Sequence, residues 1–332
     1  MREFPLLPRQ RCAFVFVAAS APLVTVSARL PWPLVAAILL LTLALLTGLG
    51  ALEARAGVLW PRAAKTVWGN GLGGAILVLQ LLFAAVYLWQ LALATDSAFP
   101  EQQTLPFVPL TLLAVCALAA GRGRETCVRA VGVLFLFLVA LYGAVFAFAA
   151  PDVELSRLTV LPAGGDLLPL GVVALLPFFS VALPSSQGKI RLPVLWMLAF
   201  VLLPTAAAAF CAAVPGSRGS LYDMAKSVEV FSVARRIEPL VSCGLTIGWF
   251  AALCLTAVFA GAAAQGLGLS FRTGAVGVCV PAALGSFVDI ALPPGLLLSV
   301  GAVFCVLLPI LTQGIVCRKK GVKKAKKGVD KG

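Results

Sequence analysis

Histidine is absent from this sequence of 332 residues, and charged residues make up only 12% of it. Without imidazole, catalytic triads and metal sites that depend on histidine are excluded. The nine cysteines are scattered, mostly inside apolar runs, and no two of them form a CxxC pair, so we expect them to be small core residues. Paired carboxylates, a nucleophile beside a base and a phosphate-binding glycine loop are also missing. The sequence therefore predicts neither an enzyme nor a bound metal or other cofactor.

The apolar content is high: 61% of the residues are hydrophobic and the mean hydropathy is +1.03. These values place the chain outside the soluble globular class and predict an all-α polytopic membrane protein. Apolar runs of membrane-crossing length predict ten transmembrane helices. They cover approximately residues 12–30, 32–52, 68–94, 105–120, 130–150, 167–184, 192–214, 239–261, 273–290 and 294–316.

A polar, turn-rich linker at 151–166 divides these spans into two repeats of five, at 1–150 and 167–316. Because each half contains an odd number of spans, the second half must cross the membrane in the opposite sense to the first. The sequence thus predicts a five-plus-five inverted repeat. A basic tail follows at 317–332.

The basic residues predict the orientation. With the N-terminus in the cytoplasm, 20 of the 26 lysines and arginines lie on the cytoplasmic side, which favours cytoplasmic termini at both ends. The distribution of the net charge of +13 thus reflects the membrane topology, and the basic tail is expected to lie near anionic lipid headgroups. No nucleic-acid partner is expected. The first span also has features of a secretory signal, since VSA precedes Arg29; the charge pattern favours its retention.

The first span of each half contains a proline, Pro22 in the first and Pro177 in the second. A proline removes one backbone hydrogen bond, and paired interrupted helices in inverted repeats indicate a ligand site at mid-membrane. Helix N-termini freed by such breaks suit a carboxylate and freed carbonyls suit an ammonium group, so an amino acid is the expected ligand. The alternative is that the prolines make plain kinks and that the neighbouring side chains only pack. The predicted ligand-binding residues are Ala19, Ser20, Ala21, Pro22, Tyr87, Pro177, Phe178, Phe179, Ser180 and Trp249, with Gln90 as a further candidate.

A polar stripe precedes and enters the span at 239–261. At helical spacing, Arg235, Glu238, Ser242, Thr246 and Trp249 share one face, which predicts that this face meets protein or a water-filled cavity. The alternative is an interfacial charge pair with hydroxyls bonded to their own helix backbone.

Three segments of the chain resemble the B subunits of spore germinant receptors. VEVFSVARRIEPLVSCGLTIGW carries an arginine, hydrophobic, acidic motif at Arg236, Ile237 and Glu238, followed by Trp249. GRGRETCVRAVGVLF at 121–135 resembles the family's entry into the fifth span, and VELSRLTVLPAGGDLLPLGVVAL at 153–175 its linker into the sixth.

That family belongs to the amino acid–polyamine–organocation transporter superfamily. The resemblance implies ten spans in the LeuT-like fold, a small germinant such as an amino acid bound midway, and assembly with A-type and C-type receptor subunits in the inner spore membrane. The sequence departs from the family at two places. Span 1 lacks the expected glycine at its break, and Ser180 stands where an acidic residue is frequent.

Three functions are therefore weighed: a germinant-sensing receptor subunit, a secondary amino acid transporter of the same fold, and a structural subunit whose pocket is vestigial. The absence of a carboxylate inside spans 1 and 6 disfavours ion-coupled transport.

Overall fold

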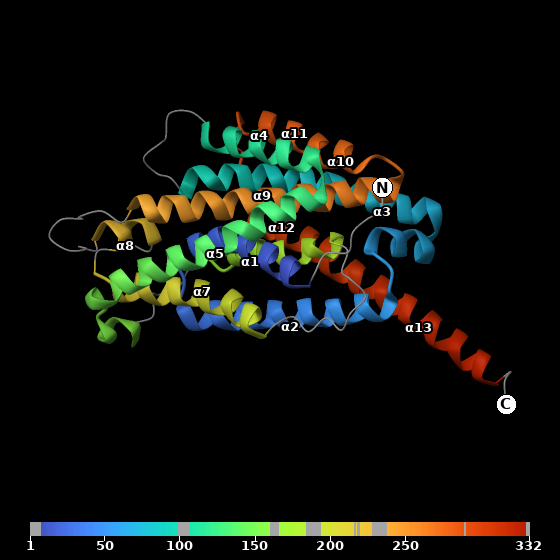
Figure 1. Ribbon diagram of the computed structural model, residues 1–332, viewed down its shortest axis with the longest axis horizontal. Coiled ribbons are helices and arrows are strands. Elements are labelled where there is room, and N and C mark those ends of the chain that lie inside the picture. The colour runs from blue at the N-terminus through green and yellow to red at the C-terminus, as the bar shows by residue number, and fades with distance from the viewer. Residues whose placement is uncertain are drawn as a thin grey trace.

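A computed structural model describes residues 8–98, 107–159, 166–183, 194–215, 217, 220–227, 238–288 and 290–329. The described residues form a bundle of helices without a strand (Figure 1). The long helices are α1 (Pro8–Ser27), α2 (Trp32–Ala56), α3 (Trp60–Ala98), α5 (Arg124–Ala149), α9 (Glu238–Leu267) and a continuous run of α12 (Pro294–Gly301), η4 (Ala302–Leu307) and α13 (Leu308–Val329). The backbone of α3 is non-helical at Gly69 (φ 76°, ψ 173°), so α3 consists of two helices joined by a kink. The shorter apolar helices are α4 (Phe107–Arg122), α6 (Leu168–Val173) followed by η3 (Leu176–Ala182), α7 (Val194–Ala213), and α10 (Phe271–Gly277) followed by α11 (Cys279–Gly285). The connections contain η1 (Ala150–Asp152), η2 (Leu155–Thr159) and α8 (Leu221–Ser227).

Six helices of the described part are long and apolar enough to cross a membrane, and four shorter apolar helices coincide with the remaining predicted spans. Large apolar side chains cover the outside of the bundle: Leu41 is 62% exposed, Leu118 72% and Leu136 74%. A soluble protein rarely leaves such a belt in water. The fold is therefore that of an all-α membrane protein.

Helix α9 lies at the centre of the bundle and contacts α1, α3, α4, α5, α10 and η3. Its described part starts at Glu238, one residue before the predicted span at 239–261, and Pro239 lies in its first turn. Its glycines allow close approach. A Cβ at Gly244 would lie 2.6 Å from Leu141 of α5, and one at Gly266 would lie 2.7 Å from Leu77 of α3. In membrane proteins, small residues at helix crossings allow the helix backbones to approach closely.

Connections that are far apart in the sequence meet at the two ends of the bundle. At one end, residues after α2, at the start of α5, at the end of η3 and after α9 line one cavity. At the other end, the Trp32 indole N–H donates to the carbonyl of Leu158, and the Glu154 N–H donates to that of Ala213. The α1–α2 connection, the 151–159 segment and the end of α7 are therefore neighbours.

Buried polar side chains join α3 to the run of α12, η4 and α13. Gln80 accepts a hydrogen bond from the Trp60 indole at 2.8 Å and donates to the carbonyl of Phe304 at 2.8 Å. Phe304 lies in η4, a π-helical segment whose wider turns disturb the regular backbone bonding. About two helical turns further along this run, the Trp68 indole donates to Thr312 at 2.9 Å. Gln80 thus secures the irregular part of the last span.

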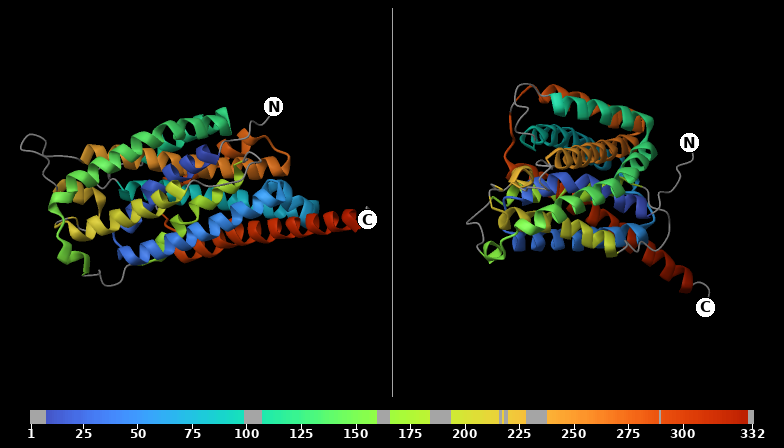
Figure 2. Two further views of the ribbon diagram at one scale, coloured as in Figure 1. Left: turned by 60° about the horizontal axis from the view of Figure 1, so that its bottom comes forward. Right: turned by 60° about the vertical axis from the view of Figure 1, so that its left-hand side comes forward.

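One prediction about backbone continuity is wrong. Helix α1 runs unbroken through Pro22, so the first of the two predicted breaks is absent. Helix α13 extends to Val329, so most of the predicted basic tail at 317–332 is helical. Figure 2 shows α13 running beside α2 and then past the end of the bundle.

We expect Gln80→Leu to lower the stability of the bundle by about 1–3 kcal/mol, because the indole N–H of Trp60 and the carbonyl of Phe304 would remain buried without a partner. The measurement is the thermal midpoint of the purified protein in detergent, followed by tryptophan fluorescence. Leu79→Ala, on the exposed face of the same helix, is the control and should change the midpoint little. Equal midpoints for Gln80→Leu and the wild type would contradict this role.

Candidate functional site

The span at 167–183 is interrupted near its middle, as the sequence predicts. Helix α6 ends at Val173, and the chain continues as the tighter 3₁₀ helix η3 from Leu176. The N–H of Leu175 donates to the carbonyl of Val172 at 3.2 Å, and Pro177 contributes no N–H. A 3₁₀ segment of seven residues is unusually long and is typical of a functional hinge.

Tyr87 of α3 binds the interruption directly. Its hydroxyl donates to the carbonyl of Val172 at 2.8 Å. That carbonyl, at the break, thus accepts one hydrogen bond from a side chain in addition to the one from the N–H of Leu175. Its ring packs edge-on against Phe179 of η3, with 5.0 Å between the ring centroids, and Phe179 stacks on Phe259 of α9 at 4.7 Å. The structure therefore brings together the predicted residues Tyr87 and Phe179 and adds Phe259, which the sequence analysis missed.

The predicted residues of α1 face α9 instead. A Cβ at Gly248 would collide with Ala21 and lie 2.9 Å from the Ser20 hydroxyl, so the two helices touch at this point. The Ser20 hydroxyl donates to the carbonyl of Val17 at 2.7 Å, and that of Thr25 donates to the carbonyl of Ala21 at 2.8 Å. The close contact with α9 at Gly248 holds α1 next to Pro22, where the helix continues on both sides.

Trp249 follows Gly248 and is 1% exposed. Its indole N–H has no hydrogen-bond partner among the described residues. A buried donor without a partner is costly, and tryptophan normally finds one when buried. Trp249 is therefore the predicted residue with unused capacity to bind a polar ligand.

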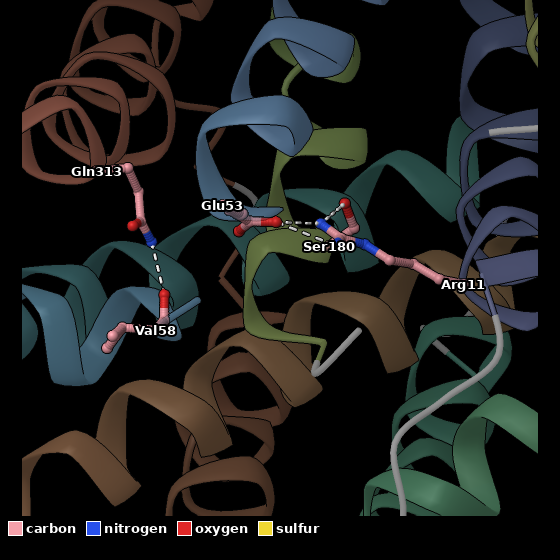
Figure 3. Close-up of polar contacts among 5 residues, drawn as sticks. All are labelled: Arg11, Glu53, Val58, Ser180 and Gln313. Carbon is pink, nitrogen blue, oxygen red and sulfur yellow. Dashed lines mark hydrogen bonds and ion pairs between the residues drawn. The ribbon is translucent and has the colours of Figure 1, made fainter. Parts of the chain in front are cut away.

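A buried ion pair lies beside η3 (Figure 3). Both terminal nitrogens of Arg11 in α1 donate to Oε2 of Glu53 in the last turn of α2, at 3.0 and 3.1 Å, and Nη2 also donates to the Ser180 hydroxyl at 3.3 Å. The side chains of Arg11 and Glu53 are 12% and 7% exposed. The second carboxylate oxygen of Glu53 has no hydrogen-bond partner in the described part of the chain. Three elements are thus joined by one charged contact at the end of the bundle.

The sequence analysis missed this pair because Glu53 was assigned to the loop after span 2. A signal was present: Glu53 is the only acidic residue between Glu3 and Asp96, and it stands at the end of an apolar run. Close by, Gln313 of α13 donates to the carbonyl of Val58 at 3.0 Å (Figure 3).

The other predicted residues are either buried in the helix packing or bonded to nearby backbone groups. All ten predicted ligand-binding residues are buried. Gln90 donates to the carbonyl of Ile290 and accepts from the N–H of Leu292, so it holds the connection before α12. On the predicted polar stripe, Thr246 is exposed, so it does not face protein in the described part of the chain. Its hydroxyl donates to the carbonyl of Ser242, which agrees with the alternative of hydroxyls bonded to their own helix backbone. Glu238 is half-buried at the start of α9, and Arg235 and Arg236 lie outside the described residues.

The described residues offer stacked aromatic faces at Phe179 and Phe259, an indole N–H without a partner at Trp249, and a carboxylate oxygen without a partner at Glu53. In the described ranges, no group of three or more cysteine or acidic side chains is placed to hold a metal ion.

Comparison with models of protein families gives no match, and comparison with curated proteins gives none either.

We expect removal of either member of the Arg11–Glu53 pair to be strongly destabilising. Arg11→Gln or Glu53→Gln should each lower the free energy of unfolding, and Arg11→Gln, which leaves a buried carboxylate without its counter-charge, by about 3–5 kcal/mol. The double variant Arg11→Met/Glu53→Leu should lose less than the sum of its single variants, which a double-mutant cycle of thermal midpoints measures.

The exposed pair of Arg129 and Glu125, at 2.6 Å on α5, is the matched control. Arg129→Gln should cost less than about 1 kcal/mol, because an exposed ion pair contributes little. Equal costs for the two pairs would show that the Arg11–Glu53 contact is not buried in the functional protein.

Proposed function

We propose that this chain is the membrane subunit of a spore germinant receptor and that it binds a small zwitterionic germinant, an amino acid, between α1, α3, η3 and α9. The resemblance of three segments to the B subunits of such receptors supports the class of protein. The observation that carries the binding role is the interruption between α6 and η3, packed against α3 and α9. The indole N–H of Trp249, ten residues before Phe259 on α9, has no partner among the described residues and adds a buried donor.

The interruption supplies the means of sensing. Tyr87 binds the carbonyl of Val172, and Ser180 of η3 binds Arg11, so both ends of the interrupted segment are held by side chains. A ligand that takes over either contact shifts the equilibrium between two arrangements of this segment. Partner subunits of the A and C types, in the inner spore membrane, would detect that shift.

The proposal includes ten crossings in a LeuT-like inverted repeat with both termini in the cytoplasm. The meeting of the connections after α2, α4, η3 and α9 at one end of the bundle supports it, because these are the even-numbered connections of a ten-span chain. The basic residues in these connections and in α13 support the cytoplasmic assignment of that end.

A secondary amino acid transporter of the same fold is the second candidate, and Glu53 favours it. A buried carboxylate oxygen without a partner, beside an interrupted helix, is a group to which a proton or a cation can couple. Uptake of radiolabelled amino acids into proteoliposomes separates the two functions, since accumulation against a gradient occurs only with a transporter.

We expect one or more of the common amino acids to raise the thermal midpoint of the purified protein. At a ligand concentration of 100 times the dissociation constant, the free energy of unfolding should rise by about 2.7 kcal/mol. Trp249→Phe keeps an aromatic ring but removes the N–H, and it should weaken the active ligand about tenfold or more. Trp89→Phe removes a similarly unpartnered indole N–H outside the proposed site and is the control. If no amino acid changes the midpoint, the pocket is vestigial and the binding role is wrong.

Pro177→Ala restores a backbone N–H inside η3 and favours a regular helix there. We expect the variant to accumulate in the membrane normally and to need about tenfold more germinant for a half-maximal germination response, a shift of about 1.4 kcal/mol. The two measurements are membrane abundance by immunoblot and the germination dose response. Equal loss of both would assign Pro177 to folding alone.

A further inference from the structure

A cavity of about 280 Å³ opens at the end of the bundle where the connections meet. Its lining consists of Leu59, Pro61, Arg62, Arg124, Ala182, Ala262, Gln265, Gly266, Gly268 and Leu269. None of the predicted ligand-binding residues is among them, so the cavity is separate from the proposed germinant site. Arg62, Gln265 and Leu269 are exposed, which leaves the cavity accessible from water.

The charge of the lining is positive. Arg62 lies in the first turn of α3, Arg124 is the first residue of α5, and none of the described residues that line the cavity carries a carboxylate. Two arginines among the described lining residues favour an anionic ligand.

Arg124 is held in position by α9 and α10. Its Nη2 donates to Oε1 of Gln265 at 2.8 Å, and its guanidinium lies over the ring of Phe271, 5.2 Å from the centroid. Gln265 is fixed in turn by the end of α9, where the N–H of Gly268 donates to its carbonyl at 3.1 Å and the N–H of Leu269 donates to that of Ala264 at 3.0 Å. A guanidinium held in this way loses little conformational freedom when it binds an anion.

We propose that this cavity binds a phosphate anion, carried either by the headgroup of an anionic phospholipid or by a soluble phosphate. Arginine presents parallel N–H groups that match phosphate oxygens, and the bonds are charge-assisted. The volume is close to the lower end of the range for small-molecule pockets, which suits a phosphate with a small substituent. Leu59, Pro61 and Leu269 supply the apolar part of the lining.

The test uses the full chain purified in detergent. Thermal midpoints are measured by tryptophan fluorescence against added phosphatidylglycerol, phosphatidylcholine, or sodium phosphate balanced with sodium chloride for ionic strength. The variants are Arg62→Gln and Arg124→Gln, and the control is Arg55→Gln, which removes the same charge from an exposed position at the same end of the bundle but outside the lining.

The wild type should be stabilised by phosphatidylglycerol and not by phosphatidylcholine, and each lining variant should need about tenfold more of the anion. Stabilisation by inorganic phosphate as well identifies a soluble anion as the ligand, whereas phosphatidylglycerol alone identifies a lipid headgroup. Arg62 is exposed, so Arg62→Gln should fold even if Arg124→Gln does not. An unresponsive wild type, or an equal loss in Arg55→Gln, would overturn the proposal without affecting the germinant site.

Discussion

The bundle depends on how closely its helices approach α9. In a membrane, lipid tails are as apolar as leucine, so helices associate through close packing and hydrogen bonds rather than through the hydrophobic effect. Gly248 lets α1 touch α9, Gly244 admits Leu141 of α5, and Gly261 admits the Phe271 ring at the start of α10. Gly244 and Gly248, at i and i+4, share one face of α9, and Gly261 lies on another, so the positions of α1, α5 and α10 are all set relative to α9.

Side chains satisfy the irregular backbone that this packing surrounds. Tyr87 binds the carbonyl of Val172 at the interruption between α6 and η3, and Gln80 binds that of Phe304 in the π-helical segment η4. Both residues come from α3 and lie about two helical turns apart, so one helix supports the two irregular spans of the second half. A dry interior requires such partners, since water is not there to replace them.

The sequence predicts the class of the fold and the position of the helices well, because long apolar runs can only be buried or face lipid. It also predicts the interruption at 175–183, where Pro177 and the neighbouring residues lack the bonding of a regular helix. Pro22 misleads for a physical reason: a proline removes one backbone hydrogen bond of the helix, and the close packing of α1 against α9 at Gly248 can compensate for that loss. The Arg11–Glu53 pair depends on how helix ends meet in space, which residue spacing along the chain does not specify.

The π-helical segment η4 sets the rotational phase of everything that follows it. An α-helix turns by about 100° and rises by 1.5 Å per residue, and a π-helical turn accommodates one extra residue. Since α13 continues from η4 without interruption, the directions of Gln313, Arg318 and Lys319 around the helix axis are set by the geometry of Ala302–Leu307. Conversion of that turn to regular α-helix would rotate these side chains by roughly a quarter of a revolution, so a change of helix type inside the last span would alter which residues meet at the end of the bundle.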